Sequence, residues 1–164
     1  MNIQVPNRVI KIISKVKNGD LTKLKLRLLD ILACPQDKNW PLKTHIFEKK
    51  QIENPIIPEK DKNTNVVCRF YCAKKDIKLI EEKNQNEYEI SKKVNKINYS
   101  IDCKECLSVE LVNGVIECKK CGNYYPIVEE IPMMLEPELR NSDVENEFIN
   151  KWSGKIKELS QKKR

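Results

Sequence analysis

The sequence predicts an α+β fold: a small antiparallel sheet domain with a polar central insertion and a C-terminal amphipathic helix. The sheet is indicated by residues 108–112 and 115–117, in which apolar and polar side chains alternate. Asn113-Gly114 stands between these runs, and this dipeptide favours the tight type I′ turn of a hairpin. The helix is indicated by apolar residues that recur with helical spacing after Ser142.

The composition fits one compact domain with some strongly polar segments. The chain has 164 residues, of which 40% are hydrophobic, 34% charged and 6% aromatic. A formal net charge of +7 favours acidic partners, but lysines alternate with glutamates, a pattern typical of solvated surfaces. There is no apolar run long enough to span a membrane and no signal-peptide pattern. We therefore expect a cytoplasmic protein, in which paired cysteines indicate metal rather than disulfides.

The order of polar and apolar segments predicts the domain organisation. A polar stretch rich in Lys, Glu and Asn interrupts the apolar segments of the sheet domain, as an insertion would. Helical spacing of apolar residues also predicts a helix over 6–17. The predicted parts are an N-terminal extension at 1–23, the sheet domain at 24–47 and 99–136, the central insertion at 48–98, and a C-terminal helix with a basic tail at 137–164.

Each element of the sheet domain follows from its local pattern. The apolar residues 24–35 predict a short strand or helical turn against the core, and 42–47 predict a strand. Residues 66–80 are expected to contain a pair of strands, and 124–128 a further strand. In the last element, Ser142 and Glu145 predict a capping box. The apolar face of that helix is made by Val144, Phe148, Ile149, Trp152, Ile156 and Leu159.

Two Cys-x-x-Cys pairs predict the metal site. They are Cys103 with Cys106 and Cys118 with Cys121, and the predicted hairpin would return the second pair beside the first. Four thiolates match the tetrahedral coordination that zinc prefers, and a site closed in this way is structural. The sequence therefore predicts a zinc-ribbon-like domain that holds structural Zn²⁺, whose binding energy contributes to folding.

The other three cysteines leave the ligand set open. Cys34 precedes a proline, as knuckle cysteines do, but Asp37 stands where its cysteine partner would be. Cys68 and Cys72 are spaced too widely for a knuckle, so each of the three is expected to be a small buried apolar residue. Two alternatives remain: Cys34 replaces one of the four ligands, or Cys34, Asp37, Cys68 and Cys72 form a second site.

No pattern typical of an active site occurs in the sequence. The single histidine, His45, lies in a predicted strand without a companion motif, so we expect a structural role for it. Glycine-rich phosphate loops and nucleophile elbows are missing as well. We expect a protein without catalytic residues of its own, and not an enzyme.

Two segments together resemble a known family. Residues 26–35, with Lys38 and Pro41-Leu42, resemble the amino-terminal motif of the small Trm-type methyltransferase-activator proteins of archaea and eukaryotes and their bacterial YcaR-type relatives. Residues 114–127 and 130–135 resemble the carboxy-terminal half of the same motif pair. The family often takes metal ligands from both motifs; here Asp37 replaces a second amino-terminal cysteine, and Cys103 and Cys106 offer another pair.

The resemblance implies a partner and a surface for it. Family members bind, stabilise and activate class I, S-adenosylmethionine-dependent methyltransferases that modify tRNA, rRNA and a release factor. The resemblance therefore implies an obligate heterodimer here, and it leaves open an indirect contact with tRNA or rRNA. The family's apolar segment after the last knuckle pairs with an edge strand of the methyltransferase. Carried over to this chain, the partner-binding residues are Tyr125, Pro126, Ile127, Ile131, Pro132, Met133, Met134 and Leu135.

Two other functions remain as hypotheses. A nucleic-acid-binding zinc ribbon of translation or transcription would use Lys104, Lys119 and Lys120 for phosphate contacts, and its binding would weaken strongly with salt. An electron carrier would hold iron in the four thiolates. We rank the activator first, the nucleic-acid-binding protein second and the electron carrier third.

Overall fold

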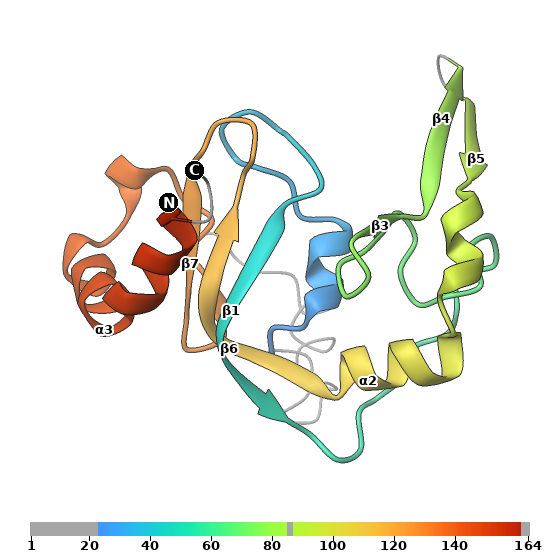
Figure 1. Cartoon of the computed structure of the whole chain (residues 1–164), viewed down its shortest axis with the longest axis horizontal. Helices are drawn as coiled ribbons and strands as arrows, with labels where there is room; N and C mark the ends of the chain where they lie inside the picture. The colour runs from blue at the N-terminus through green and yellow to red at the C-terminus, as the bar shows by residue number, and fades with distance from the viewer. Residues whose placement is uncertain (1–22, 85–86, 162–164) are drawn as a thin grey trace, which may run out of the picture.

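The computed structural model describes residues 23–84 and 87–161, and the helix predicted over 6–17 lies outside them. Its centre is an antiparallel sheet with the strand order β1-β6-β7-β8 (Figure 1). The strands are β1 (Lys43–Gln51), β6 (Val109–Glu117), β7 (Tyr124–Val128) and β8 (Ile131–Pro132). The predicted α+β class, with its antiparallel sheet and C-terminal helix, is therefore confirmed.

The predicted hairpin at Asn113-Gly114 is wrong, because β6 runs through it as one continuous strand. Gly114 pairs with Ile46 of β1 next to an irregularity in the register. A Cβ at Gly114 would lie 2.5 Å from the carbonyl oxygen of His45. The glycine is therefore needed for the close approach of two strands, a role that glycine in a strand also has.

We expect Gly114→Ala to destabilise the protein. The added methyl group would push His45 and the β1 backbone away from β6, and overpacking of this kind costs about 1–3 kcal/mol. The measurement is the free energy of unfolding in urea. Gly154→Ala is the matched control, because a Cβ there meets nothing within 4 Å and helical alanine is favoured over glycine. Equal stability of the Gly114→Ala variant and the wild type would contradict this explanation.

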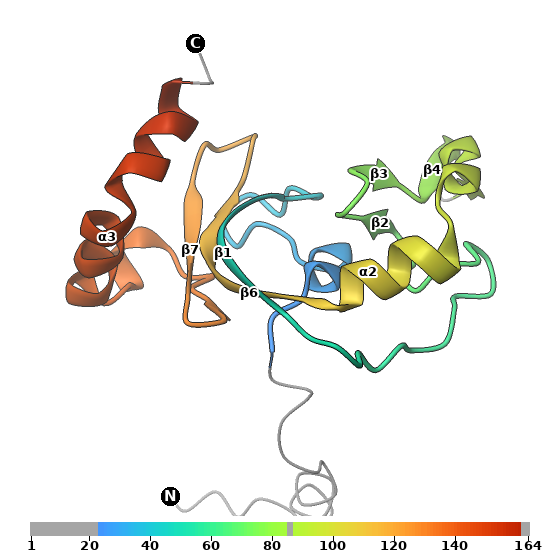
Figure 2. The ribbon, with the colours of Figure 1, turned by 60° about the horizontal axis from the view of Figure 1, so that its bottom comes forward.

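The helix α3 (Ser142–Gln161) covers one face of the sheet (Figure 2). Its buried Phe148 packs with Phe47 of β1 and Val115 of β6, while Trp152, Ile156 and Leu159 pack around them. The helix begins differently from the prediction. The side chain of Asn141, not Ser142, accepts from the N–H groups of the first turn, and Glu145 pairs with Arg140 at 2.8 Å.

The opposite face of the sheet carries the main core. Adjacent residues of a strand point to opposite faces, so Ile116 and Ile127 enter this core while Val115 and Val128 face α3. The helical turn η1 (Leu26–Asp30) covers the core with Leu29, and Leu24 just before it accepts a hydrogen bond from the N–H of Leu111 on β6. The segment expected to be a strand or a helical turn is thus a 3-10 helix.

The central region lies beside the sheet domain (Figure 1). It has a second, smaller core of its own. It extends past residue 98 to Cys103 and Leu107, beyond the boundary expected for the insertion. The predicted pair of strands within 66–80 is present as a short hairpin. The elements of this region are β2 (Tyr71–Cys72), β3 (Ile77–Lys78), β4 (Ile80–Asn84), β5 (Glu87–Ile90), η2 (Lys92–Lys96), η3 (Tyr99–Cys103) and α2 (Lys104–Leu107); a last turn, η4 (Pro137–Leu139), precedes α3.

Asp30 joins the two parts of the molecule. It is 5% exposed, and its carboxylate accepts hydrogen bonds from the backbone N–H groups of Arg69, Phe70 and Tyr71 at 2.7–2.8 Å. The next residue after these, Cys72, belongs to the second core, whereas Tyr71 packs in the main core. One side chain at the end of η1 therefore links the central region to the sheet domain.

Candidate functional site

Four side chains of metal-binding type converge at one end of the sheet. Cys34, Asp37, Cys118 and Cys121 have ligand atoms that all lie within 4.8 Å of one another. The sulfurs of Cys34 and Cys121 are 3.7 Å apart, and the sulfur of Cys118 is 3.5 Å from Oδ1 of Asp37. Zinc lies about 2.3 Å from a thiolate, which implies about 3.8 Å between ligands of a tetrahedral site. The spacing observed here fits such a site.

Two turns of the same geometry present these ligands. In the first, the N–H of Cys34 donates to the carbonyl of Asn39, and Lys38 adopts a positive φ of 58°. In the second, the N–H of Cys118 donates to the carbonyl of Asn123, and Gly122 has a φ of 78°. Asp37 in the first turn therefore occupies the place that Cys121 has in the second. A carboxylate oxygen is an accepted zinc ligand at such a position.

Hydrogen bonds distribute negative charge unequally between the two cysteines of the second turn. Burial raises the pKa of the Cys118 thiol, but the backbone N–H groups of Cys121 and Lys120 outweigh it and hold that pKa below its usual value. Burial raises the pKa of Cys121 to about 11, although the N–H of Asn123 lowers it. The turn is thus arranged to stabilise a thiolate at Cys118, the form that binds metals.

Further side chains support the ligands from outside. Tyr125, fully buried on β7, has its hydroxyl 3.1 Å from the sulfur of Cys34, and the side-chain N–H of Asn39 points to the sulfur of Cys118 at 3.6 Å. Supporting hydrogen bonds of this kind orient metal ligands. Three thiols and one carboxylate form a closed set suited to a structural metal ion.

The structure does not bring Cys103 and Cys106 to Cys118 and Cys121. Cys103 ends η3 and Cys106 lies in α2, both in the central region. The reason is the absence of the expected hairpin: a straight β6 separates the two Cys-x-x-Cys pairs by its whole length. Cys34 and Asp37 take their place beside Cys118 and Cys121, a replacement that the sequence had left open for Cys34.

The predicted partner-binding segment is divided by the structure. Tyr125, Pro126 and Ile127 are fully buried in β7, between β6 and β8, so they belong to the chain's own core and offer no free surface. The rest of the segment lies at the edge of the sheet. Ile131 is 66% exposed and Leu135 47% exposed, while Pro132, Met133 and Met134 are half-buried.

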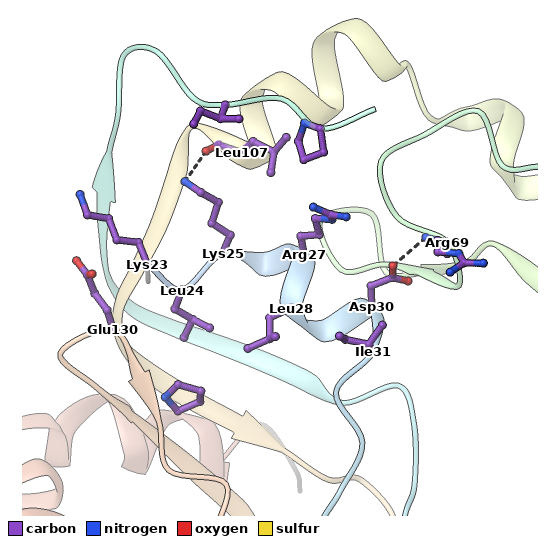
Figure 3. A pocket seen from close by; sticks show the side chains of 13 residues that line it. Lys23, Leu24, Lys25, Arg27, Leu28, Asp30, Ile31, Arg69, Leu107 and Glu130 are labelled. Carbon is purple, nitrogen blue, oxygen red and sulfur yellow. Dashed lines mark hydrogen bonds between the residues drawn. The ribbon is translucent and has the colours of Figure 1, made fainter. Parts of the chain in front are cut away.

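A groove of about 500 Å³ begins at this edge (Figure 3). Pro132 of β8 lines it, and Leu28 of η1 and Ile31 just after η1 add apolar surface. Lys25 crosses the groove to donate to the carbonyl of Leu107 at 2.9 Å, as the close-up shows. The remaining lining residues are Lys23, Leu24, Arg27, Asp30, Ile56, Pro58, Arg69, Leu107 and Glu130. The groove is therefore apolar inside with a rim of mostly positive charge.

The residues considered for other functions do not gather at one place. Lys119 and Lys120 are exposed in the turn of the metal site, whereas Lys104 lies in α2. His45 of β1 has its Nε2 2.8 Å from a carboxylate oxygen of Glu117 on the neighbouring strand. None of the described helices has the length and apolarity that crossing a membrane requires.

Comparison with models of known protein families identifies a family for this chain. The model of the family described as Trm112p-like protein matches residues 25–130, which is more than half of the 164 residues. The matched region begins just before η1 and ends just before β8, so it contains all four ligands of the candidate metal site. No curated protein matches the chain.

Proposed function

The chain belongs to the Trm112p-like family, and we propose that it is a non-catalytic subunit that activates and stabilises class I, S-adenosylmethionine-dependent methyltransferases acting on tRNA, rRNA or a release factor. The family match carries the proposal, since this family is one of small activating subunits of methyltransferases. The chain would form an obligate heterodimer with a methyltransferase in the cytoplasm. Its contribution would be to cover an apolar patch of the catalytic subunit and hold the cofactor pocket in a competent shape.

The metal site would serve this function by holding the sheet in shape. We propose Zn²⁺ as its ion and Cys34, Asp37, Cys118 and Cys121 as its ligands, supported by the ligand spacing and by the matching turns. The ion would join the turn before β1 to the turn between β6 and β7. A closed site leaves no position for a substrate, so its contribution is structural.

The partner would bind along β8, which is an edge strand of the sheet in the part of the chain that the structure describes. A strand edge offers unpaired backbone groups to an incoming strand, and exposed side chains beside it supply specificity. Ile131 and Leu135 are the exposed apolar residues at this edge, and the groove beside Pro132 extends the apolar surface. We propose that an edge strand of the methyltransferase sheet pairs along β8 and that its apolar side chains enter the groove.

We expect Ile131→Asp to weaken binding of the methyltransferase about tenfold to a hundredfold, because a buried aliphatic side chain contributes about 1.5–3 kcal/mol. Leu135→Asp should act in the same direction. The measurement is the affinity of the purified full-length chain for a co-purifying methyltransferase. Ile90→Asp on β5 is the matched control, since Ile90 is 48% exposed on a different hairpin. Unchanged affinity of Ile131→Asp and Leu135→Asp would contradict the β8 interface.

The proposed partner class is tested by a tagged pull-down at moderate and high salt, read by mass spectrometry. Class I methyltransferases should co-purify stoichiometrically and remain bound at high salt, because apolar interfaces are not screened by ions. Recovery of RNA and ribosomal proteins instead, lost as salt rises, would overturn the activator function and favour a nucleic-acid-binding protein.

A further inference from the structure

The four cysteines that do not belong to the first metal site lie together in the central region. Cys68, Cys72 and Cys103 are each 8% exposed and belong to the second core, and Cys106 is partly buried beside them. All four line one small cavity, of about 20 Å³. A space of about 10–15 Å³ suffices for a single water molecule, so this cavity has room for one ion of similar size.

The four thiols are also close enough to influence one another's pKa values. Burial raises the pKa of Cys68, and Asp30 and the thiols of Cys72, Cys106 and Cys103 raise it further. Burial likewise raises the pKa of Cys106 to about 12, with Cys72 and Cys103 as the next causes. Each thiol is therefore close enough to the others for their charges to interact.

Cys72 lies in a turn of the same geometry as Cys118. It pairs with Ile77 across the β2–β3 hairpin, and Asp76 has a positive φ of 52°. The N–H groups of Lys74 and Lys75 hydrogen-bond the Cys72 thiol, as those of Lys120 and Cys121 do for Cys118.

The turn alone does not identify a site, because a carboxylate makes a similar one. Asp61 accepts from the N–H groups of Asn63 and Thr64, and Asn65 has a φ of 58°. What distinguishes Cys72 is that three further thiols converge on the same cavity. Cys103 and Cys106 reach it as a pair from consecutive turns of η3 and α2.

Ion pairs hold the two halves of the thiol cluster together. Lys75 pairs with Asp102 at 3.1 Å, and Lys74 pairs with Glu105, so the turn after Cys72 is joined to the segment around Cys103. Arg27 and Asp102 also line the cavity, and Asp102 is paired with Lys75. The cation of Arg27 would offset part of the net charge of −2 that four thiolates and one Zn²⁺ carry.

We propose that Cys68, Cys72, Cys103 and Cys106 form a second, four-thiolate zinc site that stabilises the central region. Among the described residues, only the ligand atoms of the first site all lie within 4.8 Å of one another; the four cysteines of the second cluster line a cavity, and their sulfurs are farther apart. Binding would draw the sulfurs inward to about 2.3 Å from the ion and release the protons of the four thiols. The second site is independent of the proposed function, since it needs no partner.

The test is the zinc content of the full-length chain, purified without chelator and measured by mass spectrometry of the metal. We expect two zinc ions per chain in the wild type. The double variant Cys72→Ser/Cys103→Ser should hold one, and Cys34→Ser, the matched control at the first site, should also hold one. One zinc in the wild type, or two in the double variant, would overturn the proposal.

A second measurement needs no variant and is therefore independent of folding defects. The wild-type chain is alkylated with iodoacetamide before and after treatment with a zinc chelator, and the modified cysteines are mapped. We expect Cys68, Cys72, Cys103 and Cys106 to become reactive after chelation, with release of the second equivalent of zinc. Equal reactivity with and without chelator, or a disulfide between any two of them, would overturn the second site.

Discussion

Cys118→Ser is expected to remove the metal ion of the first site and to unfold the sheet domain. Cys118, in the second turn, is fully buried in the main core and contacts the first turn through Asp37 at 3.5 Å and through Asn39 at 3.6 Å. Structural zinc contributes about 10–16 kcal/mol in small zinc domains, and the stability of a whole domain is about 5–15 kcal/mol. The loss of one ligand is therefore expected to unfold the sheet domain. The measurements are zinc content and the thermal unfolding transition.

Changes at Asp37 provide the control for this prediction. Asp37→Cys keeps a ligand at the same position of the turn, so we expect zinc content and stability to equal or exceed those of the wild type. Asp37→Ala removes the ligand and should lower both. If Cys118→Ser kept the full zinc content and a normal transition, the ion would not be held by these four residues.

Asp30→Ala is expected to separate the central region from the sheet domain. Three backbone N–H groups, at residues 69–71, would lose the carboxylate that accepts from them. The N–H of Tyr71 is buried, and a buried donor without a partner costs about 1–3 kcal/mol, so the free energy of unfolding should fall by about that amount. The measurement is urea unfolding followed by two probes, since a separated region would unfold before the rest.

Two further variants test whether Asp30 links the central region to the sheet domain. Asp30→Asn retains an oxygen that can accept hydrogen bonds, so its loss of stability should be smaller than that of Asp30→Ala. Asp61→Ala removes a similar set of hydrogen bonds, but these stay within one turn, at Asn63 and Thr64. We expect only a local effect from it. Equal losses in Asp30→Ala and Asp61→Ala would show that Asp30 does not link the two regions.

Sequence patterns correctly predicted the helices and strands whose formation depends on residues close together in the chain. The strand after Leu42 and the apolar face of the C-terminal helix were both predicted, because alternation and helical spacing record which side chains face a core. The family was also recognised, since its two motifs keep their residues and order in this chain. The detail of the helix start was missed: Asn141, one residue earlier, caps α3 as well as Ser142 could.

Asn113-Gly114 shows why the hairpin could not be predicted. The dipeptide favours a type I′ turn when nothing else acts on it, but glycine also allows two backbones to approach closely. Which role applies depends on β1, which lies more than 60 residues earlier in the chain and pairs along the whole of β6. The turn propensity of Asn113-Gly114 is weaker than the hydrogen-bond ladder between β1 and β6, so this pairing keeps β6 a continuous strand.

The sequence by itself predicted a metal site at Cys-x-x-Cys turns, an antiparallel sheet, a C-terminal helix and the family. Each of these predictions rests on residues close together in the chain. Only the tertiary structure decided which cysteines meet. It placed Cys118 and Cys121 beside Cys34 and Asp37, and Cys103 and Cys106 beside Cys68 and Cys72. The physical reason is that ligands of one site come from separate turns, and the pairing of distant strands determines which turns are adjacent.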